Sequence, residues 1–326
     1  MKLSIVIPFM NPHEQHFSEM LAGMGAADFS CFTDIEVILI NDGSQSNYQT
    51  EISLFAMAAP RLRIHTIQLS HNHGVSYARN LGMAAAKGDY IALHDADDIS
   101  QPQRFSLSAQ FLNQHPEVIA VSGDMLVFNE NHKEESLRLF PLHHQDICVD
   151  NLFYCAMAQP AMMINRALWL KSGIQYTEKM DMAQDWDWVI RLSQHGQLAN
   201  MGIPLVRYRQ HLKQRSTQIS GELANIHVRG IWEKQLKQLG TEVNTRLLHV
   251  HSHLSPYWLW QLSDIDQAWT LYPEDVSNWA TEMLSKNKIS QYVSEPILAQ
   301  KINRLQRQWQ AWKASGNPAT QIQSLL

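Results

Sequence analysis

The sequence has few of the features expected of a secreted, membrane-spanning or nucleic-acid-binding protein. It has only three cysteines, none in a CxxC pair, which is typical of reduced thiols in the cytosol. It has no run of 18 apolar residues, and the short N-terminal apolar run stops at Pro8, too early for a signal peptide. Its 26 basic and 31 acidic residues create no strong positive field for nucleic acid. We therefore expect a cytoplasmic protein that contacts a membrane, if at all, peripherally at its inner face.

Two classes of nucleotide-using enzyme also lack their signatures here. The segment PFMNPHEQ, residues 8–15, follows the first apolar run and contains neither glycine nor arginine, which a nucleotidyl-transfer phosphate loop needs. A GxGxxG motif is absent from the same place, which excludes a dinucleotide-binding dehydrogenase. With 45% hydrophobic residues, the chain still has enough apolar material for a sizeable core.

Apolar periodicity predicts alternating strands and helices in the N-terminal part. We expect strands at 3–7, 35–40, 62–69, 89–93 and 118–128, and helices at 14–24, 48–58, 75–86 and from about 101 to 115. Pro8 should end the first strand, and Ser100 should cap the last of these helices. This alternation is typical of an α/β protein with a mainly parallel central sheet flanked by helices.

The composition changes near residue 221. Glycine becomes rare, while glutamine, leucine and tryptophan become frequent and follow a helical period. We therefore predict two domains, 1–220 and 221–326, of which the second is a helical C-terminal extension that could serve an acceptor, a partner or a membrane surface.

One predicted helix of this extension carries an apolar stripe beside basic residues. The stripe lies in KINRLQRQWQAWK and consists of Ile302, Leu305, Trp309 and Trp312. Such a helix could lie on an anionic membrane surface near a lipid-linked acceptor. The alternative is packing against the rest of the protein or another subunit, and we favour packing.

Polar clusters follow several of the predicted strands. Asn11, Asp42 and the segment HDADD at 94–98 each come after a strand, and ligands collect beyond the carboxyl ends of parallel strands. Carboxylates as crowded as Asp95, Asp97 and Asp98 repel one another, and a divalent cation would make the cluster favourable. A solvated acidic turn or a helix cap is the alternative interpretation.

Six segments occur in the order and with the spacing of family 2 glycosyltransferases, which the chain resembles over about residues 1–216. They are SIVIPFMN (4–11), INDGS (40–44), GVSYARNLGMAAAKGDYIALHDADD (74–98), QPAMMINR (159–166), AQDWDWVIRL (183–192) and YRQH (208–211). The resemblance implies a GT-A fold and inverting transfer from an NDP-sugar, preferably UDP-linked, to a hydroxyl of a saccharide or lipid-linked acceptor. It also suggests a hexosyl- or N-acetylhexosaminyltransferase of bacterial surface polysaccharide assembly.

The resemblance assigns the nucleotide and the metal to particular residues. Asp95-Ala96-Asp97 resembles the DXD motif, in which Asp95 faces the ribose and a Mn²⁺ or Mg²⁺ ion. Asp97 is the expected direct ligand, with Asp98 next, and His211 resembles a position that reaches the metal or diphosphate. Asp42 resembles the acceptor of a hydrogen bond from the base, although an Asx-turn would also use it. The remaining residues of the predicted nucleotide pocket are Pro8, Met10, Asn11, Arg79 and Asn80.

The resemblance also indicates a catalytic base. Asp185 matches the residue that deprotonates the acceptor hydroxyl, and a first-turn helix position is its alternative role. We expect Asp187 to be a surface partner of Arg191 at i+4. Arg79 could pair with Asp42, pair with a DXD carboxylate, or contact the nucleotide.

Two positions depart from the family pattern. Met10 stands where many relatives have an aromatic residue near the base, which weakens the case for uracil, and Gln184 replaces a glutamate before the predicted base. A non-catalytic protein that binds a sugar nucleotide or a partner is the alternative function. The intact set of Asp95, Asp97 and Asp185 favours an enzyme.

Overall fold

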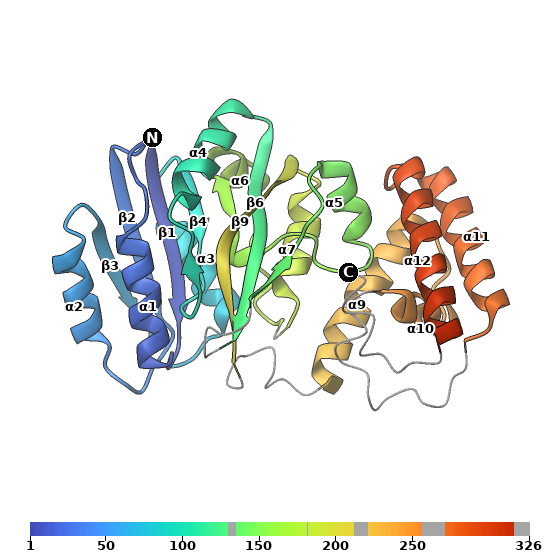
Figure 1. Cartoon of the computed structure of the whole chain (residues 1–326), viewed down its shortest axis with the longest axis horizontal. Coiled ribbons are helices and arrows are strands. Elements are labelled where there is room, and N and C mark those ends of the chain that lie inside the picture. The colour runs from blue at the N-terminus through green and yellow to red at the C-terminus, as the bar shows by residue number, and fades with distance from the viewer. Residues whose placement is uncertain (130–134, 181, 212–220, 256–270, 316–326) are drawn as a thin grey trace. The chain divides into compact units, whose positions relative to one another are not determined.

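The computed structural model describes residues 1–129, 135–180, 182–211, 221–255 and 271–315 (Figure 1). The chain forms two compact units, and each is discontinuous in sequence. The first unit consists of Met1–His144 and Met157–Gln218, and the second of Gln145–Ala156 and Ile219–Leu326. The predicted boundary near residue 220 stays a prediction. That prediction did not include the excursion Gln145–Ala156, a segment of the first half of the chain that belongs to the second unit.

The first unit is built on one nine-stranded sheet with the order β3-β2-β1-β4-β8-β6-β9-β5, and β7 pairs with β6. Pairing is parallel from β3 to β4, whereas β8 runs antiparallel to both β4 and β6. The predicted strands are confirmed, in a sheet that is parallel in its N-terminal part and mixed beyond it. Their bounds are β1 (Lys2–Phe9), β2 (Asp34–Asn41), β3 (Arg63–Gln68), β4 (Tyr90–Leu93), β5 (Ile99–Ser100), β6 (Val118–Asn129), β7 (Glu135–Arg138), β8 (Met163–Asn165) and β9 (Gln197–Gln210).

The helices of the first unit cover this sheet. Both faces of β1 are buried, which explains why its residues read as a continuous apolar run rather than an alternating one. The four helices predicted from periodicity are confirmed as α1 to α4. The bounds are α1 (Glu14–Gly25), α2 (Gln49–Ala58), α3 (Val75–Ala85), α4 (Arg104–Gln114), the 3₁₀ turn η1 (Gln159–Ala161), α6 (Arg166–Ser172) and α7 (Gln184–Leu192).

Pro8 does not end the first strand, because β1 continues to Phe9. The carbonyl of Val6 accepts a hydrogen bond from the N–H of His94, where β4 ends. Groups two residues apart in a strand point the same way, so the missing N–H of Pro8 lies beyond the end of β4. Proline is tolerated there because no ladder hydrogen bond to β4 depends on it.

Ser100 does not cap α4, which is the second correction to the predicted element ends. Ser100 belongs to β5, and α4 begins at Arg104 with Gln103 at the N-cap position. The Oγ of Ser100 instead lies 2.8 Å from His94 Nε2 and accepts a hydrogen bond from Arg104 Nη1 at 3.1 Å. Ser100 therefore belongs to a buried polar network directly behind HDADD.

Three loops at the carboxyl edge of the parallel strands are joined to one another. The N–H of Asn11 donates to Ser44 Oγ at 2.9 Å, and Asn11 Oδ1 accepts from the N–H of Gln45 at 2.8 Å. Gly43 has a φ of +74°, and a Cβ added there would lie 2.4 Å from the carbonyl carbon of His71. Only glycine lets the loop after β2 approach the loop after β3 this closely.

The second unit consists of helices packed around the excursion from the first half of the chain. Gln235 and Trp232 donate hydrogen bonds to the carbonyls of Asn151 and Phe153, and His251 Nε2 lies 2.9 Å from the carbonyl oxygen of Leu152. These bonds satisfy backbone groups that would otherwise be buried without partners. The helix bounds are α5 (His144–Asp150), α9 (Gly221–Leu239), α10 (Thr245–Leu254), α11 (Pro273–Ser290) and α12 (Glu295–Ser315).

The apolar stripe of α12 packs inside this unit. Ile302, Leu305 and Trp309 are buried in a core that includes Trp279 and Leu298, while the side chain of Trp312 lies outside the described residues. The described part of the stripe therefore packs inside the protein, which is the alternative that we favoured. Its apolar residues are not available for contact with a membrane surface. Within the described ranges, no helix is long and apolar enough to cross a membrane.

His251 lies in the same core, with its ring stacked 5.1 Å from that of Phe153. Trp279 Nε1 donates to His251 Nδ1 at 3.3 Å, so the ring hydrogen is on Nε2 and points to the carbonyl of Leu152. Burial lowers the pKa of His251 to about 4. The folded state therefore favours the neutral form of the His251 side chain.

Replacing Gly43 with alanine should destabilise the protein more than its backbone conformation alone explains. The left-handed φ would cost about 1–2 kcal/mol for an alanine, and the new Cβ would also displace the backbone of His71. Gly173 is a matched control, because it has a φ of +65° but an added Cβ meets nothing within 4 Å. Urea denaturation should show a clearly larger loss for Gly43→Ala than for Gly173→Ala. Equal losses would contradict the close approach of the two loops.

Acid should weaken the second unit through His251. A folded-state pKa of about 4 lies below the ordinary value of about 6.5. The contribution of the neutral ring is therefore fully present above pH ~6.5 and is lost as the pH falls toward ~4. His251→Gln cannot titrate, so it should lose less stability than the wild type between pH ~7.5 and ~5. Urea denaturation followed by tryptophan fluorescence measures both, and identical losses would show that His251 does not carry this pH dependence.

Candidate active site

The first carboxylate after β4 is held by an arginine from α3. Arg79 Nη2 donates to Asp95 Oδ1 at 2.8 Å, and the buried guanidinium lies 5.6 Å from the ring centre of Tyr176. Of the three partners that the sequence left open for Arg79, the structure shows a DXD carboxylate. A buried arginine is stable only beside such a partner, so this pair fixes Asp95 against α3.

The second carboxylate meets a histidine from the far end of the sheet. Asp97 Oδ2 lies 3.0 Å from Nε2 of His211, the residue directly after β9. The Asp97 side chain is 31% exposed, and the ring of His211 packs 5.1 Å from that of His16. Two residues predicted to share a metal are therefore adjacent.

The third carboxylate points into the protein. Asp98 is fully buried, and its Oδ1 accepts the backbone N–H of Arg209 at 2.9 Å. Burial raises the pKa of Asp98 well above its ordinary value, and the charges of Asp97 and Asp95 add to this. The expectation that Asp98 is the next cation ligand after Asp97 stays a prediction, and the burial of its side chain against β9 adds no support to it.

Arg209 is a site residue that the sequence reasoning missed. Its Nε donates to the carbonyl of Asp97 at 2.8 Å and its Nη2 to Glu19 at 2.6 Å, while its guanidinium lies 4.7 Å from the ring centre of Phe128. Arg209 therefore fastens the Asp97–Asp98 turn to β9 and α1. Strand alternation in YRQH, which puts Arg209 on the same side as His211, was the available signal.

Asp185 lies in the first turn of α7, close to the Asp95–Arg79 pair. The helix begins after Ala183, whose φ of 57° is left-handed, and Asp185 Oδ1 accepts the N–H of Trp186 at 2.9 Å. Burial raises the pKa of the Asp95 carboxyl, Arg79 opposes this, and Asp97 and Asp185 add to it. The charge of Asp185 therefore acts on the Asp95 carboxyl.

Asp187 pairs with Arg191 as predicted, but it is not a surface residue. Arg191 Nε donates to Asp187 Oδ2 at 2.8 Å, and Thr177 Oγ1 donates to the same oxygen at 2.9 Å. Asp187 is buried, so the surface part of the prediction is wrong. These contacts give Asp187 a structural role beside Asp185.

Asn80 uses its side-chain amide to hold another segment of the chain. Its Oδ1 accepts the N–H of Tyr176 at 2.8 Å, and its Nδ2 donates to the carbonyl of Tyr176 at 2.9 Å. Tyr176 in turn packs between Arg79 and Trp188, whose ring is stacked at 4.7 Å. A nucleotide contact by Asn80 stays a prediction to which these bonds add no support.

Asp42 binds the loop that precedes α3. Its Oδ1 accepts the N–H of His73 at 2.7 Å and its Oδ2 the N–H of Gly74 at 2.9 Å, and the residue is buried. Nearby, Met10 is 46% exposed and Asn11 joins the first two edge loops. Of the other predicted contacts, Pro8 is buried in β1 and Ala96 is partly buried within the DXD motif.

The donor atoms of the site suit a cation that arrives with a phosphate ligand. Asp97 Oδ2 and His211 Nε2 meet at 3.0 Å and offer an oxygen and a nitrogen ligand. Across the described parts of the chain, no group of three or more histidine, cysteine, aspartate or glutamate side chains could hold an ion. Cations such as Mg²⁺ commonly use one or two carboxylates and complete their shell with phosphate oxygens and water. The residues present fit that arrangement.

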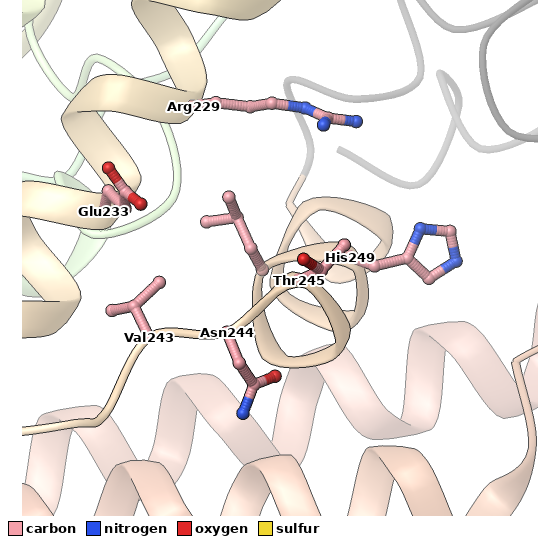
Figure 2. Close-up of a pocket in the computed structure, with 7 residues that line it drawn as sticks. Arg229, Glu233, Val243, Asn244, Thr245 and His249 are labelled. Atoms are coloured by element: carbon pink, nitrogen blue, oxygen red, sulfur yellow. The ribbon is translucent and has the colours of Figure 1, made fainter.

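A separate pocket of about 240 Å³ lies within the second unit (Figure 2). Arg229 and Glu233 project from α9, and His249 comes from α10. Its full lining is Arg229, Glu233, Val243, Asn244, Thr245, Leu248 and His249. None of the residues predicted to bind donor or metal lines this pocket.

Several glycosyltransferases resemble this chain in sequence. A Haemophilus influenzae protein named uncharacterized glycosyltransferase is 25% identical over 223 residues, which cover 66% of this chain and 67% of that protein. The amylovoran biosynthesis glycosyltransferase AmsE of Erwinia amylovora is 33% identical over 115 residues, which cover 34% of this chain and 41% of AmsE. The chain thus spans less than half of AmsE.

Two solved structures share the fold. The structure of Staphylococcus aureus TarS 1–349 in complex with UDP-GlcNAc has a TM-score of 0.59 at 15% identity, covering 95% of this chain and 92% of that one. The mannosyltransferase PcManGT from Pyrobaculum calidifontis, in complex with GDP-Man and Mn²⁺, has a TM-score of 0.53 at 15% identity, covering 96% and 84%. These similarities confirm the expected GT-A fold.

The family described as "Glycosyl transferase family 2" matches residues 4–168, about half of the chain. The matched region contains the first four of the six motif segments, including Asp42, Arg79 and the DXD aspartates that the fold brings to the carboxyl edge of its parallel strands. The chain belongs to glycosyl transferase family 2.

Proposed function

We propose that this glycosyltransferase transfers a sugar, with inversion, from an NDP-sugar to a hydroxyl of a saccharide or lipid-linked acceptor. The observation that carries the proposal is the meeting of Asp97 with His211, across 114 residues of sequence, beside the Asp95–Arg79 pair. A partly exposed carboxylate and an imidazole at the carboxyl edge of a parallel sheet suit a metal-bound diphosphate. Asp185 supplies a second carboxylate close to this cluster.

The donor is proposed to be UDP-linked and to carry a hexosyl or N-acetylhexosaminyl group. TarS, described in complex with UDP-GlcNAc, supports this choice, while PcManGT, described with GDP-Man, shows that the fold also accepts another base. A place in bacterial surface polysaccharide assembly is supported by the name of AmsE, which refers to amylovoran biosynthesis.

Asp97 and His211 would hold Mn²⁺ or Mg²⁺, with Asp95 beside them. When bound, the cation would neutralise the charge that builds on the departing nucleoside diphosphate. Arg79 holds Asp95 in place from α3, and Arg209 holds the Asp97 backbone from β9. The protein thus prepares the position of its ligands before the donor binds, which lowers the cost of organising the site.

Asp185 would accept the proton of the attacking hydroxyl. Its carboxylate is partly buried, and its charge acts on both Asp95 and Arg79, which supports a place beside the proposed diphosphate site. An acceptor oxygen deprotonated there would attack the anomeric carbon from the side opposite the diphosphate, which inverts its configuration. Asp185 Oδ1 is oriented by the N–H of Trp186.

Replacing Asp97 with asparagine should weaken nucleotide binding only when a divalent cation is present. Calorimetric affinity for UDP with Mn²⁺ should fall by about tenfold or more, since a charged ligand is lost. In EDTA, both proteins should bind UDP equally weakly. Asp34→Asn is a matched control, because Asp34 pairs with Arg63 on the surface at the start of β2. Unchanged affinity of Asp97→Asn with Mn²⁺ would remove the metal assignment.

Replacing Asp185 with asparagine should lower turnover by about 10²–10⁴-fold, the usual contribution of a general base. Asparagine keeps an oxygen for the Trp186 N–H, so the melting temperature and donor affinity should change little. Asp187→Asn should behave in the opposite way, because it weakens the contacts with Arg191 and Thr177 and so costs stability. Transfer rates at saturating donor decide between them, and near-normal turnover in Asp185→Asn would assign the base elsewhere.

A further inference from the structure

Three aromatic rings form a ladder in the loop and first helical turn after β3. The ring centres of His71 and His73 lie 4.0 Å apart with planes at 30°, and those of His73 and Tyr77 lie 4.8 Å apart at 21°. Tyr77, in the first turn of α3, is partly buried, while the His73 side chain is 29% exposed. His71, at the other end, is exposed, so the ladder ends in a flat ring at the protein surface.

The loop that carries the ladder is held rigidly. The N–H of His73 donates to buried Asp42 at 2.7 Å, and its ring Nδ1 lies 2.8 Å from the carbonyl oxygen of His71. Ser70 Oγ lies 3.0 Å from Nδ1 of His71, and Gly43 allows the neighbouring loop to press against the His71 backbone. A ring surface fixed in this way loses little conformational entropy when a flat ligand binds to it.

The ladder lies on the side of the site where the base is expected. Asp42, predicted from the family to contact the base, is in direct contact with His73. The loop containing Met10 and Asn11 is joined to the Gly43 loop through Ser44, and the Gly43 loop touches His71. The first loop offers the thioether of Met10 where relatives offer a ring, whereas the loop after β3 brings the exposed ring of His71 to this connected rim.

We propose that the donor nucleobase stacks on the outer face of His71, with His73 and Tyr77 supporting it from behind. This inference rests on the proposed nucleotide-sugar donor and identifies the surface that recognises its base. Asp42 accepts the backbone N–H groups of His73 and Gly74, so it also positions the ladder beside the expected base. Stacking of a base on a ring contributes about 1–3 kcal/mol and tolerates different bases, because every base has a flat π face.

The experiment compares a ligand that has a base with one that lacks it. In calorimetry with Mn²⁺, a His71→Ala/His73→Ala variant should bind UDP about 5- to 150-fold more weakly than the wild type, as the cited stacking energy implies. Its affinity for inorganic pyrophosphate should be unchanged. His115→Ala is the matched control, since His115 is also an exposed histidine. Its ring centre lies 4.5 Å from that of Phe111, and it precedes the first residue of β6, at the sheet edge opposite to the ladder.

A second variant separates stacking from polar contacts. His71→Phe keeps a flat ring without ring nitrogens and should retain UDP affinity close to that of the wild type. A loss as large as that of the double alanine variant would overturn the stacking role, because only hydrogen bonding or charge would explain it.

The outcomes distinguish this inference from the function on which it rests. Unchanged UDP affinity in the double alanine variant, with the expected loss in Asp97→Asn, would overturn the ladder alone. Equal weakening of UDP and pyrophosphate would also overturn it, because the base would not be what the rings recognise. A wild-type protein that binds neither ligand would overturn both proposals.

Discussion

Three carboxylates within four residues can remain at the end of β4 because each has its own partner. Like charges at this spacing repel one another, and burial penalises each charge further. The chain meets this constraint by bringing groups from α3 and from the far strand β9 to the same turn. The pairs are Asp95 with Arg79, Asp97 with His211, and Asp98 with the backbone N–H of Arg209. The placement of α3 and the path of β9 are tied to this turn.

The pairs around the turn differ in burial and therefore in role. Asp98 and Arg209 are buried and serve the fold, while Asp97 and His211 stay within reach of solvent. The buried pair holds the turn in position, so the partly exposed Asp97 and His211 already lie side by side. The free-energy cost of holding these like charges together is therefore met when the protein folds rather than when a ligand binds, as in preorganised active sites.

Helix α3 links the two sides of the carboxyl edge. Asp42 accepts the N–H of Gly74, directly before the first residue of the helix, and Arg79 in the next turn holds Asp95. The loops after β2 and β4 are therefore fixed to one rigid element. A displacement of α3 would disturb Asp42 and Asp95 together, and α3 and the DXD turn both lie in the segment 74–98 that resembles the family.

Local rules were enough to predict β1 to β4, β6, helices α1 to α4 and the edge on which the polar residues lie, because apolar periodicity and strand direction determine them. The partner of each aspartate was beyond those rules. Asp97 meets His211 across 114 residues, and the inward direction of Asp98 depends on the backbone of β9. The Gln145–Ala156 excursion depends in the same way on helices that follow much later in the chain.

The α12 stripe shows a different limit of prediction from sequence. Ile302, Leu305 and Trp309 are spaced as they would be on a membrane-surface helix or in a helical core. Periodicity alone does not distinguish these two environments, because both need one apolar face. The packing of the stripe against the other helices of the second unit was needed to decide between them.

Release of nucleoside diphosphate from sugar nucleotides tests the central claim most directly. The purified protein would be incubated with a panel of UDP- and GDP-sugars, with Mn²⁺ or with EDTA, and free UDP and GDP would be quantified. Slow release from at least one donor, dependent on Mn²⁺ and absent with EDTA, is the predicted result. Absence of release from every donor with Mn²⁺ present, although the same donors bind, would contradict the account and favour a protein that binds sugar nucleotides without turning them over.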